Sequence, residues 1–104
     1  MKILLIEPNK QPTVKTIKHT LESMQKEVGG YIQAIYPYED EVALICNEEG
    51  KICGLPLNRF LFDEEGNLID IIAGTFFICG APIDSENFTS LTDKQIKKYT
   101  EIFY

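Results

Sequence analysis

The chain has one arginine, Arg59, and it directly follows Asn58 between two apolar runs. The other nine cationic side chains are lysines. Because only a guanidinium presents a planar fork of N–H donors, a single arginine among lysines indicates a point where that geometry matters. Two interpretations stay open. Either Asn58 and Arg59 contact a phosphate, a carboxylate or an aromatic ring of a ligand or partner, or Arg59 forms an internal ion pair with Asp70 or with a carboxylate of residues 63–65.

A second candidate segment sets aromatic rings beside carboxylates. Its members are Tyr36, Tyr38, Glu39, Asp40 and Glu41. Aromatic residues are enriched in protein interfaces, and charge helps to select the partner, so the segment is a reasonable protein-contact patch. The alternative is that these residues only edge a loop and pack the core.

The acidic residues are clustered, and the net charge at pH 7 is −6. Such a charge argues against direct binding to nucleic acid, which relies on lysine and arginine against phosphate. The clusters form either solvated turns that keep a small domain in solution or an acidic surface for a basic partner, such as a nucleic-acid-binding protein. They are Glu39-Asp40-Glu41, Glu48-Glu49, Asp63-Glu64-Glu65, Asp84 and Glu86.

No catalytic pattern surrounds these candidates. Asp70 stands among apolar residues without a second carboxylate at catalytic spacing, so we expect it on the wet face of a strand or paired. His19 is isolated and is predicted to lie on the surface. The sequence has no phosphate-binding loop, dinucleotide fingerprint or nucleophile elbow. We therefore predict no catalytic residue and no cofactor, and a protein that is not an enzyme.

The three cysteines, Cys46, Cys53 and Cys79, each lie in an apolar run and lack the paired spacing of a zinc site. They are predicted to be buried free thiols, and no metal site is expected. A disulfide between Cys46 and Cys53 would be unusual in a reducing cytosol.

Local signals predict two helices. Thr20 can cap a helix over about residues 20–28, which ends at Gly29-Gly30. Thr92 and Gln95 form a capping box for a helix over about residues 92–103. Apolar residues recur at helical spacing in both: Leu21, Met24 and Val28 in the first, and Ile96, Tyr99 and Phe103 in the second.

Apolar and β-branched runs predict strands over residues 2–6, 13–17, 31–36, 42–46, 68–72 and 75–79. Residues 42–53 are predicted as a hairpin, and residues 57–62 as a short helix or a buried loop. Together these elements predict a single α+β domain over residues 1–104, with a mainly antiparallel sheet of five or six strands and both helices on one face of it.

The longest apolar runs fall far short of the roughly 20 residues that a membrane crossing needs. The opening run at residues 2–6 is too short for a signal peptide. We expect a cytoplasmic protein without membrane contact.

Several segments, taken together, resemble an uncharacterised domain family carried by phages, plasmids and conjugative elements, mostly of Firmicutes. The resemblance spans essentially the whole chain and implies a mobile-element accessory protein, without catalytic residues to carry over. Small acidic proteins of that setting are often inhibitors of host defence, which is an argument by analogy. The segments are Glu7-Pro8, Val28–Ile32, Leu55–Arg59, Asp70–Phe77 and Phe88–Thr92.

The leading hypothesis is a non-enzymatic binding protein that inhibits a host defence component by direct contact through the acidic turns and the tyrosine patch. The alternative is a binder that sequesters a nucleotide-like signal. Asn58 and Arg59 would then hold phosphate or base, with Tyr36 or Phe60 stacking. A homo-oligomer would help such a binder, because 104 residues form few deep pockets alone.

Overall fold

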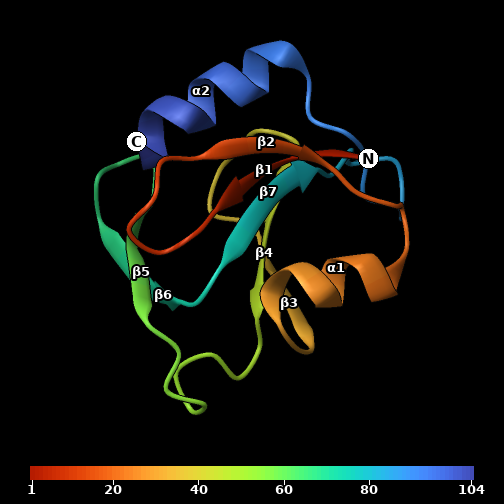
Figure 1. Cartoon of the computed structure of the whole chain (residues 1–104). Helices are drawn as coiled ribbons and strands as arrows, with labels where there is room; N and C mark the ends of the chain where they lie inside the picture. The colour runs from red at the N-terminus through yellow and green to blue at the C-terminus, as the bar shows by residue number, and fades with distance from the viewer.

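The computed structural model describes residues 1–104 and contains seven strands and two helices (Figure 1). In chain order they are β1 (Lys2–Ile6), β2 (Thr13–Thr16), α1 (Leu21–Val28), β3 (Ile32–Ile35), β4 (Val42–Asn47), β5 (Leu57–Phe62), β6 (Leu68–Ala73), β7 (Phe76–Gly80) and α2 (Asp93–Phe103). Five strands form an antiparallel sheet in the order β2-β1-β7-β4-β3, and β5 and β6 form a separate antiparallel hairpin. The α+β class, the antiparallel five-stranded sheet and the two helices are confirmed.

The central strands of the five-stranded sheet are apolar on both faces. In β1, Leu4 and Ile6 belong to one buried cluster, and Ile3 and Leu5 belong to another on the opposite face. A sheet of this kind must be covered on both sides, so α2 packs on the face of Leu4 and α1 packs on the face of Ile3 (Figure 1). The prediction that both helices share one face is wrong for this reason.

The β5–β6 hairpin lies on the same side of the sheet as α2. Leu61 of β5 and Ile72 of β6 are buried in one cluster with Phe103 of α2. Residues 57–62, which were expected as a short helix or a buried loop, are therefore a strand. Apolar residues face both sides of this strand, because Leu61 is fully buried while its neighbour Phe60 is exposed. The sequence therefore lacks the alternation of apolar and polar residues that marks a strand.

The predicted hairpin over residues 42–53 is also wrong. β4 pairs with β3 on one side and with β7 on the other, so neither of its edges is free for a further strand. Residues 48–54 form turns instead. These turns carry Ile52 and Cys53 to the surface, where both side chains are exposed.

Both helices start where their N-terminal capping signals indicate, and α1 also ends at its predicted glycine cap. The Thr20 hydroxyl accepts a hydrogen bond from the N–H of Ser23 at 3.1 Å, and Gly29 ends α1 with a φ of +78°. At α2, the hydroxyl of Thr92 accepts from the N–H of Gln95 at 3.1 Å, and the Gln95 side chain accepts from the N–H of Thr92 at 3.0 Å. Neither helix has the length and apolar content that a membrane crossing requires.

The burial of single residues departs from the predictions at two positions. Cys46 and Cys79 are buried thiols as expected, and burial raises their pKa values to about 11 and about 12. Cys53 is exposed, because the turn that carries it lies outside the sheet. Leu21 is also exposed, although it continues the apolar face of α1. His19 lies on the surface, as predicted.

Candidate binding site

Asn58 holds the β5–β6 hairpin against the main sheet. Its side-chain amide donates hydrogen bonds to the main-chain oxygens of Ile6 and Gly74, both at 2.9 Å. Ile6 ends β1 and Gly74 links β6 to β7, so one side chain joins segments 52 and 16 residues away. Asn58 is therefore a structural clamp between the two sheets.

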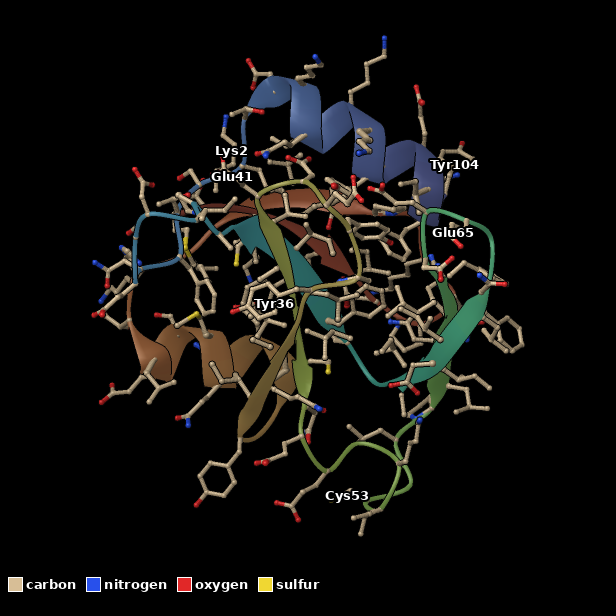
Figure 2. The ribbon with its side chains drawn as sticks, turned by 180° about the vertical axis from the view of Figure 1, so that it is seen from behind. Lys2, Tyr36, Glu41, Cys53, Glu65 and Tyr104 are labelled. Atoms are coloured by element: carbon tan, nitrogen blue, oxygen red, sulfur yellow. The ribbon has the colours of Figure 1, made fainter.

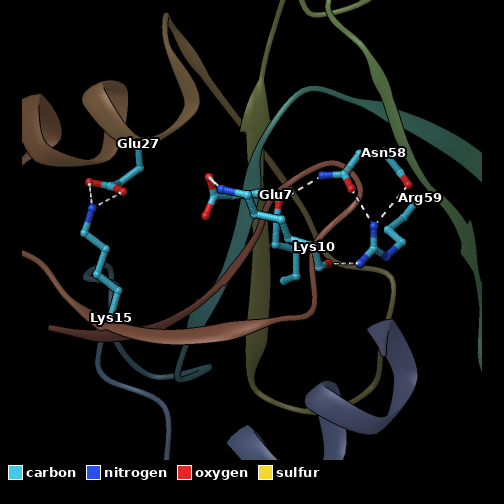
Figure 3. A network of polar contacts seen from close by, with 7 residues as sticks. Glu7, Lys10, Lys15, Glu27, Asn58 and Arg59 are labelled. Atoms are coloured by element: carbon cyan, nitrogen blue, oxygen red, sulfur yellow. Dashed lines mark hydrogen bonds and ion pairs between the residues drawn. The ribbon is translucent and has the colours of Figure 1, made fainter.

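Arg59 extends this clamp to the loop after β1 (Figure 3) and also to the end of α2. Its guanidinium donates to the main-chain oxygen of Lys10 at 2.7 Å and to that of Phe103 at 3.2 Å. It also donates to the side-chain oxygen of Asn58 at 2.8 Å and to the main-chain oxygen of the same residue at 3.3 Å. Four of its five N–H donors are thus used within the chain.

The predicted ion pair of Arg59 with Asp70 or with residues 63–65 is wrong. Asp70 pairs with Lys51 instead, and the hydrogen bond from this lysine lowers the pKa of the Asp70 carboxyl. Asp63 accepts hydrogen bonds from main-chain N–H groups within its own turn. The forked guanidinium of the only arginine donates hydrogen bonds to carbonyl oxygens of separate segments, and a lysine could not contact all of these oxygens at once.

The aromatic and acidic segment lines a groove, which we call the acidic groove. It is an open hollow of about 580 Å³ between residues 36–42 and residues 81–88. Pairing of β4 with β7 brings the two segments together, and the N–H of Ala81 donates to the main-chain oxygen of Glu41 at 2.8 Å. Tyr36 and Glu41 mark the two ends of the connection between β3 and β4 in Figure 2. The groove carries four carboxylates: Glu39, Asp40, Glu41 and Glu86.

Two of these carboxylates are engaged within the chain. Glu41 accepts a hydrogen bond from the N–H of Ile83 at 3.0 Å. Asp40 accepts from the buried hydroxyl of Tyr99 at 3.0 Å and from the side chain of Gln95 at 3.3 Å. Burial alone would raise the pKa of Asp40, but these hydrogen bonds outweigh it and the pKa is lowered. Asp40 therefore anchors α2.

The other two carboxylates are free to meet a partner. Glu39 and Glu86 are exposed, and their carboxylate oxygens accept no hydrogen bond within the chain. Tyr36 beside them is 63% exposed, whereas Tyr38 is buried against α2, where its ring packs at a tilt on that of Tyr99 with the ring centres 5.1 Å apart. The groove thus presents one exposed ring and two unengaged negative charges on a single surface.

The structure divides the predicted site residues into two places. Tyr36, Tyr38 and residues 39–41 all line the acidic groove, while Asn58 and Arg59 form the clamp and do not line it. Sequence reasoning did not place residues 81–88 in the same site. Their acidic pair near Pro82 was a visible signal, but its position depends on the pairing of β4 with β7.

The contact of Asp40 with α2 predicts a pH-dependent loss of stability. Because the folded pKa of Asp40 is lowered, its contribution is present above the unfolded pKa of about 3.9 and is lost as the pH falls through the folded value. We expect Asp40→Asn to lower the free energy of unfolding by about 1 kcal/mol at neutral pH, with the deficit shrinking near pH 3. Chemical denaturation at both pH values measures this. Asp84→Asn, at an exposed residue, should change little, and a deficit for Asp40→Asn that is constant with pH would contradict the assignment.

Comparison with known proteins gives one match. No curated protein and no solved structure matches the chain. A family model described as "Domain of unknown function (DUF3846)" matches residues 1–104. The match covers the sheet, both helices, the clamp and the acidic groove. The chain therefore belongs to the DUF3846 family.

Proposed function

We propose that this protein is a non-enzymatic binding protein whose acidic groove holds a basic segment of another protein. The observation that carries the proposal is the pair of exposed carboxylates, Glu39 and Glu86, that find no partner within the chain. Charges arranged this way speed association and select a partner of the opposite charge. Tyr36 adds an exposed ring, a residue type that is enriched at protein interfaces.

The partner that fits this groove is a basic protein of the kind that binds nucleic acid. A groove that carries carboxylates would compete with phosphates for the same lysines and arginines. In the mobile-element setting that the sequence resemblance implies, the partner is a host defence component in the cytoplasm. Occupation of its nucleic-acid-binding surface would then inhibit it.

A nucleotide-like ligand gains no support from the geometry at Arg59. Only one N–H of the guanidinium remains without an acceptor in the chain, so it cannot grip a phosphate with two parallel hydrogen bonds. Asn58 likewise uses its amide on main-chain oxygens. The acidic groove is therefore the better supported of the two sites.

Co-purification from a host lysate tests the proposal when it is paired with charge-reversed variants. Glu39→Lys combined with Glu86→Lys changes the charge of the groove without removing a hydrogen bond from the fold. We expect the wild-type protein to retain a basic partner at about 50 mM salt and to release it at about 500 mM, because screening shortens the range of the attraction. The variant with lysine at positions 39 and 86 should fail to retain the partner at either salt concentration.

The matched control carries the same change of charge away from the groove. Glu49→Lys combined with Glu101→Lys alters two exposed carboxylates that do not line it. This variant should retain the partner at low salt. Equal loss in both variants would show that net charge alone drives the association, and absence of any partner at low salt would refute the proposal.

A further inference from the structure

The β5–β6 hairpin carries five exposed apolar side chains, which together with Ile102 of α2 we call the hairpin face. Phe60 and Phe62 of β5 alternate with the buried Leu61, and Phe60 lies opposite Ile71 in the ladder. The face is formed by Leu57, Phe60, Phe62, Leu68 and Ile69, with Ile102 of α2 beside it. These six side chains are between 47% and 67% exposed.

The size of this patch is unusual for a single small chain. At roughly 200 Å² for a fully exposed large side chain, the six residues leave on the order of 600 Å² of apolar surface in water. That is at the upper end of the largest patch on a typical monomer, and a stable interface buries about 800 Å² on each partner. The half-buried Ile71 and the stem of Lys98 can supply the remainder.

The charges around the hairpin face fit a second copy of this chain. The two strands carry only two charged residues, and both are engaged: Arg59 in the clamp and Asp70 with Lys51. Two molecules of net charge −6 repel wherever their acidic turns meet, and the two strands add no unpaired charge to that repulsion. At the rim, Asp63 and Glu64 lie near Lys98 around the same hollow. A two-fold axis that sets the acid of one copy against the lysine of the other would offset the repulsion at this rim.

The shape of the face also suits a like partner. A hollow of about 470 Å³ lies between the hairpin and α2, next to the protruding side chains. A two-fold symmetric interface uses the same surface of each copy, so that surface must contain both the protruding side chains and the hollow that receives them.

We infer that the protein forms a two-fold symmetric homodimer through the hairpin face. This inference does not depend on the proposed function. Tyr38 lines both hollows, but the exposed apolar residues and the rim charges of the hairpin face do not line the acidic groove. The dimer would therefore present two acidic grooves, and a bivalent partner would bind it more tightly than one groove allows.

Sedimentation equilibrium of the purified protein over a range of micromolar concentrations tests the inference. We expect a mass of twice the 11.9 kDa of one chain. Phe60→Lys should raise the dissociation constant of the dimer by about 100-fold or more, because each copy would bury an unpaired lysine in an apolar interface. Leu57→Lys, at the other end of β5, should also raise the dissociation constant. Agreement between the two variants would show that the effect is not a local distortion at Phe60.

Tyr31→Lys is the matched control, because Tyr31 is an exposed aromatic residue that does not belong to the hairpin face. It should remain a dimer. Circular dichroism should show an unchanged fold in all three variants, since the replaced side chains are mostly exposed. A wild-type protein that stays monomeric throughout the concentration range, or a Phe60→Lys variant that dimerises as well as the wild type, would overturn the inference.

Discussion

Arg59→Ala is expected to lower the free energy of unfolding by about 3 kcal/mol, because it removes a charged donor from four hydrogen bonds that join separate segments. The carbonyl oxygen of Phe103 would lose its guanidinium partner at the C-terminus of α2, where a positive charge is favourable. Denaturant titration followed by circular dichroism measures the loss.

Two further variants separate geometry from charge at this position. Arg59→Lys keeps the charge but cannot reach acceptors on several segments at once, so it should recover less than half of the lost stability. Lys97→Ala, at an exposed residue of α2 without a partner in the chain, should change stability by less than about 0.5 kcal/mol. If Arg59→Lys recovered all of the stability lost in Arg59→Ala, charge alone would explain the effect, and the clamp geometry would be contradicted.

Gly80→Ala is expected to cost about 3 kcal/mol, because the end of β7 has no room for a methyl group. A Cβ at this position would collide with the Thr89 hydroxyl oxygen and would lie 2.9 Å from the main-chain oxygen of Ser90. Gly80 and Thr89 are bridged by two main-chain hydrogen bonds of 2.8 Å, so the neighbouring segment cannot withdraw without breaking them. Thermal and denaturant unfolding measure the effect.

The double variant Gly80→Ala with Thr89→Ala tests which atoms are responsible. Removal of the Thr89 hydroxyl relieves the closest contact but leaves the main-chain oxygens in place. We expect partial recovery only. A single Gly80→Ala variant as stable as the wild type would contradict the packing described at this bridge.

The parts of the fold that depend on local signals were predictable. The caps of α1 and α2 involve residues three positions apart, so Thr20, Thr92 and Gln95 indicated the helix starts without knowledge of the tertiary structure. The apolar run at residues 2–6 likewise indicated the strand β1. Because this run has no polar face, it requires cover on both sides of the sheet, and the structure places one helix on each side.

The parts that depend on pairing across long stretches of chain were not predictable. Residues 51–53 looked like the return strand of a hairpin, but β4 takes β7 as its partner from more than 30 positions further along the chain. The role of Arg59 depends on carbonyl oxygens of Lys10 and Phe103, which carry no signal in the sequence. The pair of segments that forms the acidic groove depends on the same β4–β7 pairing.

The most direct test of the acidic groove is a photo-crosslinking measurement at Tyr36. A photoreactive phenylalanine analogue there should capture a basic partner, whereas the same analogue at Tyr31, which is 66% exposed against 63% for Tyr36, should capture little. Capture at Tyr36 should also disappear when Glu39 and Glu86 are both replaced by lysine. Equal capture at the two tyrosines, or capture at Tyr36 that survives the charge reversal, would contradict a groove that binds through its free carboxylates.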